Sequence, residues 1–154
     1  MIRQTPAYAF AIALALSFSA SLAAPARAAG PADTVAAFYQ KIGSEVDPDT
    51  RSRFSGSAEA FLNEADAFWE AKQEPCISFG FSIDGQDYDE AEVAGSLALS
   101  EQLDGEAATV TATFTNFGRP TEIVWSLVKS GSDWLVSDIA STTTGWRVSD
   151  MACE

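Results

Sequence analysis

The sequence predicts an α+β domain, with N-terminal helices packed on a curved antiparallel sheet. Three observations predict this class. Up to about residue 72 the apolar residues recur at helical spacing, and after Pro75 they alternate with polar or small residues at the period of a strand. Glycine-containing turns then separate successive strand-like segments. Helices followed by a meander of strands close most simply with the helices on one face of a bent sheet, which gives a cone-shaped domain with a pocket inside.

The first 28 residues have the order of a secretory signal peptide. Arg3 precedes an uncharged apolar run over residues 7–24, and Ala26-Arg27-Ala28 forms a small-x-small cleavage motif. A run of about 18 apolar residues is also long enough for an uncleaved membrane anchor. Its Ala- and Ser-rich composition favours removal, so we expect residues 1–28 to be cleaved after Ala28. Residues 29–154 are then a single α+β domain, periplasmic or secreted from a bacterium.

Composition narrows the class of partner. The chain has nine Lys and Arg against 22 acidic residues; two of the basic residues lie in the leader, so seven remain and residues 29–154 carry a formal charge of −15. Such a surface disfavours nucleic acid and anionic membrane, and it suits either simple solvation or a basic protein partner. The chain contains no histidine, the commonest zinc ligand and proton shuttle near neutral pH. We expect no cofactor.

Both cysteines, Cys76 and Cys153, belong to the part predicted to be exported, where an even number of cysteines is typically paired. We therefore expect one structural disulfide between them. A catalytic thiol is the poorer alternative, because the chain has no histidine to activate it. The disulfide would tie the end of the chain to the point where the helices give way to the sheet.

Two amphipathic helices are expected first. One runs from Asp33, a suitable capping residue, to Gly43, with a single apolar stripe. That stripe consists of Val35, Phe38, Tyr39 and Ile42. After a turn over residues 47–54, the second helix runs from about Ser57 to Lys72. Its apolar side consists of Phe61, Leu62, Ala65, Phe68 and Trp69.

Strands are expected over residues 76–83, 92–103, 108–117, 121–129 and 133–140, with a hairpin turn at Asp104-Gly105. The third alternates clearly: Val110, Ala112 and Phe114 face one way and Thr109, Thr111, Thr113 and Thr115 the other. This threonine ladder fits a face for homodimerisation and the solvent side of a half-buried sheet equally well. The fourth is apolar on both faces, which predicts a central strand covered on both sides.

Three short motifs resemble an exported bacterial domain-of-unknown-function family with the nuclear transport factor 2-like (cystatin-like) fold. They are Gly85-Gln86-Asp87, Asn116-Phe117-Gly118 and Trp134-x-Val136-x-Asp138-Ile139. The resemblance covers most of residues 32–150 and implies a fold and a compartment. It implies no activity, because the broader fold serves isomerases, dehydratases and binding modules alike. Where that family often has Asp or Asn in the first strand, this chain has Phe79, Gly80 and Ser82.

Residues 81–90 place four carboxylates around one glycine. Counted from Asp84, the glycine stands at position 2 and not at position 6 of a calcium-binding loop, so an EF-hand is excluded. An irregular cation site using Asp84, Asp87 and Asp89 stays open. The simpler interpretation is a solvated turn in which Gly85 takes a positive φ.

Asp138 is the candidate for a catalytic base. Strand alternation places it on the same face as Trp134 and Val136, and an acid beside large apolar groups suits general-base catalysis, with a hydroxyl from Tyr88 or Tyr39. Alternatively, its carboxylate accepts hydrogen bonds from backbone amides or from Arg147 and orients the C-terminal segment.

Three aromatic residues, Trp134, Tyr88 and Trp125, are candidates for lining a ligand pocket, although core packing is the default for aromatic side chains. The sequence favours an exported binding or accessory domain for a small ligand or a protein over an enzyme. Two alternatives stay open. One is a pocket enzyme with Asp138 as general base, and the other is an immunity or inhibitor protein that neutralises a basic partner such as a cell-wall hydrolase.

Overall fold

A computed structural model describes residues 29–154, and the predicted signal peptide with its cleavage position lies outside the described residues. The helices are α1 (Pro31–Gln40), α2 (Gly56–Lys72) and α3 (Glu90–Ser96), with short 3-10 segments η1 (Ser44–Val46), η2 (Pro48–Arg53) and η3 (Val148–Asp150). The strands are β1 (Ala98–Asp104), β2 (Ala107–Asn116), β3 (Arg119–Ser130) and β4 (Asp133–Ser141). Across this described part, none of the helices combines the length and the apolar character that crossing a bilayer requires.

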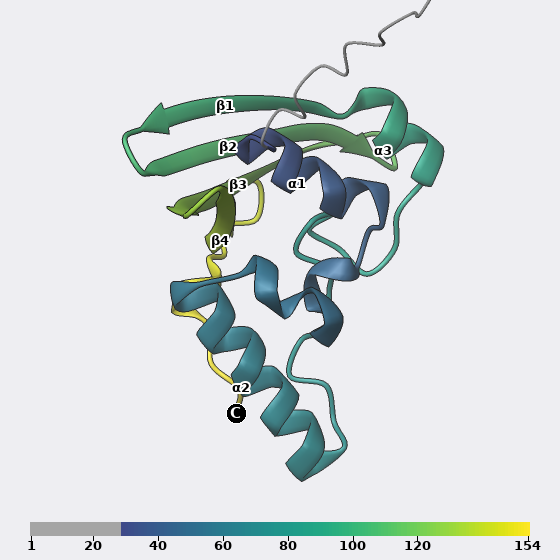
Figure 1. The fold of residues 1–154 in the computed structure, drawn as a ribbon. Coiled ribbons are helices and arrows are strands. Elements are labelled where there is room, and N and C mark those ends of the chain that lie inside the picture. The colour runs from purple at the N-terminus through teal and green to yellow at the C-terminus, as the bar shows by residue number, and fades with distance from the viewer. Residues whose placement is uncertain (1–28) are drawn as a thin grey trace, which may run out of the picture.

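The four strands form one antiparallel sheet in the order β1-β2-β3-β4. Tight turns join them, one of which is the predicted hairpin at Asp104-Gly105. Helices α1 and α2 lie on the same side of the sheet, and α2 extends away from it with the C-terminus beside it (Figure 1). The predicted α+β class, helices packed on an antiparallel sheet, is confirmed.

Aromatic rings occupy the space between α1 and the sheet. Trp125 of β3 is fully buried and stacks on Phe38 of α1, with ring centroids 5.2 Å apart and planes inclined by 11°. Tyr39 meets Trp125 and Phe114 edge-on, and its hydroxyl accepts a hydrogen bond of 3.4 Å from the Trp125 indole. The rings therefore fill the region in which the sequence predicted a pocket.

The segment over residues 76–83 is a loop and not the predicted strand. Phe81, Ser82 and Ile83 are all buried, and they lie in a turn that an isolated bridge between Gly80 and Gly85 closes. The Ser82 N–H and hydroxyl both donate to the carboxylate of Glu45, at 3.0 and 2.9 Å. A side chain from η1 thus satisfies a backbone donor that would otherwise need a neighbouring strand.

The predicted strand over residues 92–103 divides into helix α3 and strand β1. Val93 and Leu97 are four residues apart, a spacing that fits one face of a helix as well as one face of a strand. Asp89 decides the outcome, because its carboxylate accepts a hydrogen bond of 2.9 Å from the Glu92 N–H and caps the first turn.

Three predictions were wrong: that β3 is covered on both faces, that Trp69 belongs to the buried side of α2, and that Asp138 shares a face with Val136. The outer face of β3 is not covered, since Val128 is 37% exposed. Trp69 is 51% exposed near the end of α2, beyond the reach of the sheet. In β4 the register shifts so that Val136 pairs with Leu127 while Asp138 pairs with Ser126. This bulge at Ser137 puts Asp138 on the face opposite to Val136.

Candidate functional site

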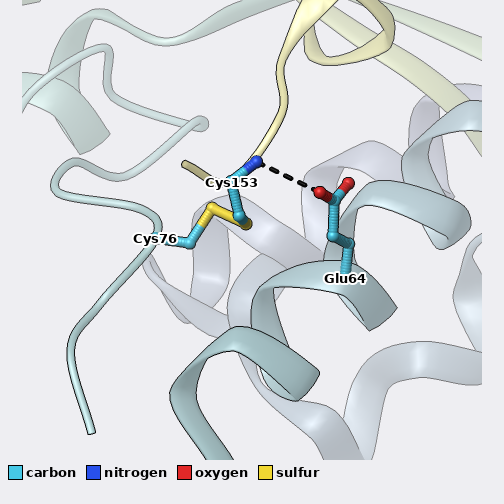
Figure 2. The surroundings of a disulfide bond; sticks show 3 residues. All are labelled: Glu64, Cys76 and Cys153. Carbon is cyan, nitrogen blue, oxygen red and sulfur yellow. Dashed lines mark hydrogen bonds between the residues drawn. A yellow bond between two sulfur atoms is a disulfide. The ribbon is translucent and has the colours of Figure 1, made fainter. Parts of the chain in front are cut away.

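The predicted disulfide between Cys76 and Cys153 is present, with Cα atoms 5.3 Å apart. The backbone N–H of Cys153 also donates to the Glu64 carboxylate of α2 at 3.2 Å, so the chain end is held at two points (Figure 2). The bond encloses the 76–89 loop and the whole sheet. Because disulfides persist in oxidising compartments, this one indicates a location outside the cytoplasm.

Asp84, the first acid of the acidic loop, is enclosed by donors from the segment that follows β4. Its carboxylate accepts hydrogen bonds from the Ser141 hydroxyl at 2.6 Å, from the Thr144 hydroxyl at 2.7 Å and from the Trp146 indole N–H. Asp84, and not Gly85, has the positive φ, 52°, which Asp tolerates better than most residues. Asp84 therefore acts as a clasp between two loops, contrary to the prediction of a solvated acid with a left-handed Gly85.

The other acids of this loop hold the end of the β2–β3 hairpin. The side chain of Asn116 accepts a hydrogen bond from the Asp89 N–H at 3.0 Å and donates to the Asp87 carbonyl at 3.1 Å. Both oxygens of Glu92 accept from the Gly118 N–H at 3.0 and 3.1 Å. Within the described residues no three Asp, Glu, Cys or His side chains are grouped as metal ligands would be.

Phe117 stands at the tip of this hairpin with 61% of its surface exposed. Its φ is 49° and that of Gly118 is 73°, as in the two-residue turns that normally use Asn-Gly. The other two hairpin turns have glycine at the equivalent first position, Gly105 and Gly131, with φ of 62° in both. Phe117 is therefore a large apolar residue in a position that favours glycine.

Two neighbouring surface grooves flank the hairpin end. The first, of about 420 Å³, lies between the acidic loop and the tip and is lined by Asp84, Asp87, Asn116, Phe117 and Arg119 among others. The second, of about 440 Å³, lies beside β2 and shares Pro120, Thr121 and Thr143 with the first as a common wall. Both are open to the surface and have mixed polar and apolar linings.

Asp138 has a full set of partners. One oxygen accepts from the Ser149 N–H at 3.1 Å, and the other accepts from Arg147 Nη1 at 2.8 Å and from the Ser149 hydroxyl at 3.0 Å. The Ile139 N–H adds a fourth bond at 2.9 Å. The carboxylate thus holds η3 and the C-terminal segment against β4, and its geometry matches the structural alternative considered for it.

The three candidate ligand residues do not converge. Trp125 is fully buried in the core. Trp134 lines a groove with Arg53 of η2, whereas Tyr88 lines surface grooves beside Ile42 on the other side of α1. Sequence reasoning also missed Glu45, which is fully buried. Nothing in its local sequence distinguishes Glu45 from the exposed acids.

No protein-family model and no curated protein matches this chain. Two solved structures share its fold, the native and the selenomethionine crystals of the type VI effector–immunity complex Tae3–Tai3 from Ralstonia pickettii. The selenomethionine match covers 73% of this chain and 97% of the matched chain at 16% identity with a TM-score of 0.53. The native match covers 74% and 96% at 17% identity, also with a TM-score of 0.53. The resemblance to the nuclear transport factor 2-like family stays a prediction.

Proposed function

We propose that this chain is an exported immunity protein that binds a basic effector protein and blocks it. The observation that carries the proposal is the fold match, which spans 97% of one chain of a crystallised effector–immunity complex. The structural alignment therefore spans the matched chain almost from end to end. A partner protein, in preference to a small ligand, is also supported by the aromatic rings that fill the space between α1 and the sheet.

The composition of the chain favours the immunity role over the effector role. The sequence contains no histidine, and its two cysteines are joined in a disulfide, so a Cys–His or Ser–His catalytic pair is not available. The candidate base Asp138 is engaged by Arg147 and Ser149. An inhibitor needs only a stable, complementary surface, and these features are compatible with that requirement.

Compartment and charge indicate the kind of effector. The disulfide and the predicted signal peptide favour the periplasm as the place of action. A formal charge of −15 on residues 29–154 attracts a basic protein and accelerates the encounter with it at low ionic strength. The proposed partner is a basic effector that acts on the cell envelope.

The test begins with capture of the partner. Purified residues 29–154 are immobilised, periplasmic extract is passed over them, and retained proteins are identified by mass spectrometry and produced recombinantly. We expect a basic protein that binds in a one-to-one ratio and whose export to the periplasm stops growth. Co-production of the full chain should restore growth.

A matched control separates protection from simple overproduction. The chain without residues 1–28 is expected to give no protection, because it remains in the cytoplasm where the disulfide does not form. The proposal is wrong if no retained protein survives purification as a stable complex, or if growth is restored equally well without the leader.

A further inference from the structure

From the geometry of the hairpin end we infer that the β2–β3 turn is the contact that enters the partner, with the Phe117 side chain as its anchor. The partner surface that fits it is an apolar socket with a basic rim. This inference rests on the proposed function and goes beyond it by assigning the binding surface.

Phe117 is the most exposed of the large apolar residues in the described chain, at 61%, followed by Leu103 at 58%. Aromatic residues that stand out from the surface are typical energetic anchors of protein interfaces, because one ring buries a large apolar area at a small cost in side-chain entropy. Leu103 has comparable exposure but lies on β1 beside the opposite hairpin.

The backbone at Phe117 has a left-handed conformation that suits glycine better than phenylalanine. A glycine at position 117 would relieve the left-handed conformation, as Gly105 and Gly131 do in the other two turns. A phenylalanine at this position contributes little burial to the fold, since 61% of its surface faces solvent. Local strain without a compensating contact inside the fold is characteristic of residues kept for an external partner.

Hydrogen bonds hold both neighbours of Phe117, since Asn116 bonds the backbone of the acidic loop and the Gly118 N–H bonds both oxygens of Glu92. One residue further back, the Thr115 N–H donates to the Ser96 hydroxyl at 2.9 Å. The ring is therefore presented on a fixed backbone, and the hairpin end loses little conformational entropy when it binds a partner.

The charge around the hairpin end indicates the class of partner that fits it. Residues 84–92, which hold the hairpin end, contain five acids, and no Lys or Arg occurs between Lys72 and Arg119. Arg119 is the one basic residue that lines the groove beside the tip. Asp87 and Phe117 both line the groove of about 420 Å³. A partner that receives the ring brings its own surface over these carboxylates, so basic residues around the socket give favourable contacts and acidic ones are repelled.

The experiment uses two variants with the same substitution. Phe117→Asn removes the ring while keeping a residue that tolerates a positive φ, and Leu103→Asn removes an equally exposed apolar side chain about 30 Å away along β2. The affinity of the full domain and of each variant for the purified basic partner is measured by calorimetric titration. We expect Phe117→Asn to weaken binding about 30-fold or more and Leu103→Asn to change it less than about threefold.

A second pair of variants tests the rim. Asp87→Asn combined with Glu90→Gln is expected to slow association about threefold to tenfold at low salt and to have little effect at high salt. Asp104→Asn combined with Glu106→Gln, at the opposite hairpin, is the matched control and should leave the rate nearly unchanged. Thermal unfolding of every variant checks that the fold is retained.

Each outcome decides a separate point. Tight binding by wild type and equally tight binding by Phe117→Asn overturns the assigned surface and leaves the proposed function intact. Absence of any specific partner for wild type overturns both. A wild-type dimer that dissociates in Phe117→Asn, while affinity for the partner is unchanged, identifies a second copy of the chain as the occupant and also overturns the inference.

Discussion

At the scale of single residues, Phe117 shows how a local conformation and a side chain can be poorly matched. Its φ of 49° lies in the left-handed region, which costs an L residue with a bulky side chain about 1–2 kcal/mol. The side chain regains little of this energy, because it is 61% exposed. The stability of the domain should therefore increase when the residue is replaced by glycine.

We predict that Phe117→Gly raises the free energy of unfolding by about 1 kcal/mol, measured by urea denaturation. The reverse exchange is the control. Gly105→Phe introduces the same side chain at φ 62°, where nothing lies within 4 Å of the added Cβ, and it should lower the free energy of unfolding by about 1–2 kcal/mol. Destabilisation by Phe117→Gly would show that the exposed ring contributes to the fold.

Asp84 is a second residue with a defined local role. Asp84→Ala removes the acceptor of the Ser141, Thr144 and Trp146 donors, so we expect the free energy of unfolding to fall by about 1–3 kcal/mol. Asp84→Asn keeps one acceptor oxygen and tolerates a positive φ, and it should cost less. Millimolar calcium should leave the melting temperature unchanged, because these donors already occupy the carboxylate. A clear rise of the melting temperature with calcium would contradict this structural role of Asp84.

At the scale of elements, two attachments hold the helices in place within the domain. The disulfide joins the end of the chain to the loop after α2, and Arg51 of η2 pairs with Asp66 of α2 at 2.7 Å. The second attachment is the packing of α1 on β3 through the rings of Phe38, Tyr39 and Trp125. Cooperative unfolding should depend on both attachments.

Removal of the disulfide tests the first attachment. The bond links residues separated by 77 positions, and a loop of this size contributes about 4 kcal/mol by restricting the unfolded chain. We expect Cys76→Ser combined with Cys153→Ser to lower the free energy of unfolding by about this amount in urea. Reduced wild type is the control and should match the variant, whereas a reduced protein as stable as the oxidised one would show that the bond is dispensable.

Tyr39 tests the second attachment through pH. Burial raises the pKa of its hydroxyl above the ordinary 10.0, with a smaller opposing effect from the Trp125 hydrogen bond. Above pH 10 the unfolded chain therefore loses this proton while the folded chain retains it. Stability is fully present below pH 10 and decreases as pH rises further.

We expect urea midpoints to decline between pH 10 and 11 and Tyr39→Phe to show a shallower decline. At pH 7 the same variant should lose about 1 kcal/mol, because the Trp125 N–H loses its acceptor. Equal pH dependence of wild type and variant would mean that the Tyr39 hydroxyl is not buried by α1 and the sheet.

At the scale of the whole molecule, net charge is the dominant electrostatic property. Residues 29–154 have 22 acids and seven basic residues, and the described part contains three ion pairs. Repulsion among the unpaired acids opposes the compact state. It also opposes self-association through any acidic surface, while it favours approach of a basic protein.

Ionic strength should therefore act in opposite directions on folding and on binding. Raising sodium chloride from about 20 to 200 mM shortens the Debye length, and we expect the melting temperature to rise by roughly 3 °C. Under the same change the affinity for the basic partner should fall, measured by titration. Sucrose in place of salt is the control for solvent exclusion, and a melting temperature that decreases with salt would contradict dominance by repulsion.

Much of this architecture follows from the sequence by itself. The stripes of α1 and α2, the alternation of β2 and the glycine turn after Asp104 are local patterns, and the two cysteines leave one intramolecular pairing. The helices, the strand and the turn are determined by patterns within a few residues, and the disulfide follows from the number of cysteines. None of these features requires knowledge of distant neighbours. The sequence also singled out the acidic loop and Asn116-Phe117-Gly118, although not their contact with each other.

Tertiary structure alone decided the remaining points. Glu45 satisfies the backbone of Ser82 and makes residues 76–83 a loop, and the bulge at Ser137 moves Asp138 to the other face of the sheet. Likewise, the exposure of Phe117 depends on where the hairpin end meets the acidic loop. In each case the deciding partner is distant in sequence or is set by strand pairing. Periodicity along the chain carries no information about which remote group satisfies a given donor or covers a given ring.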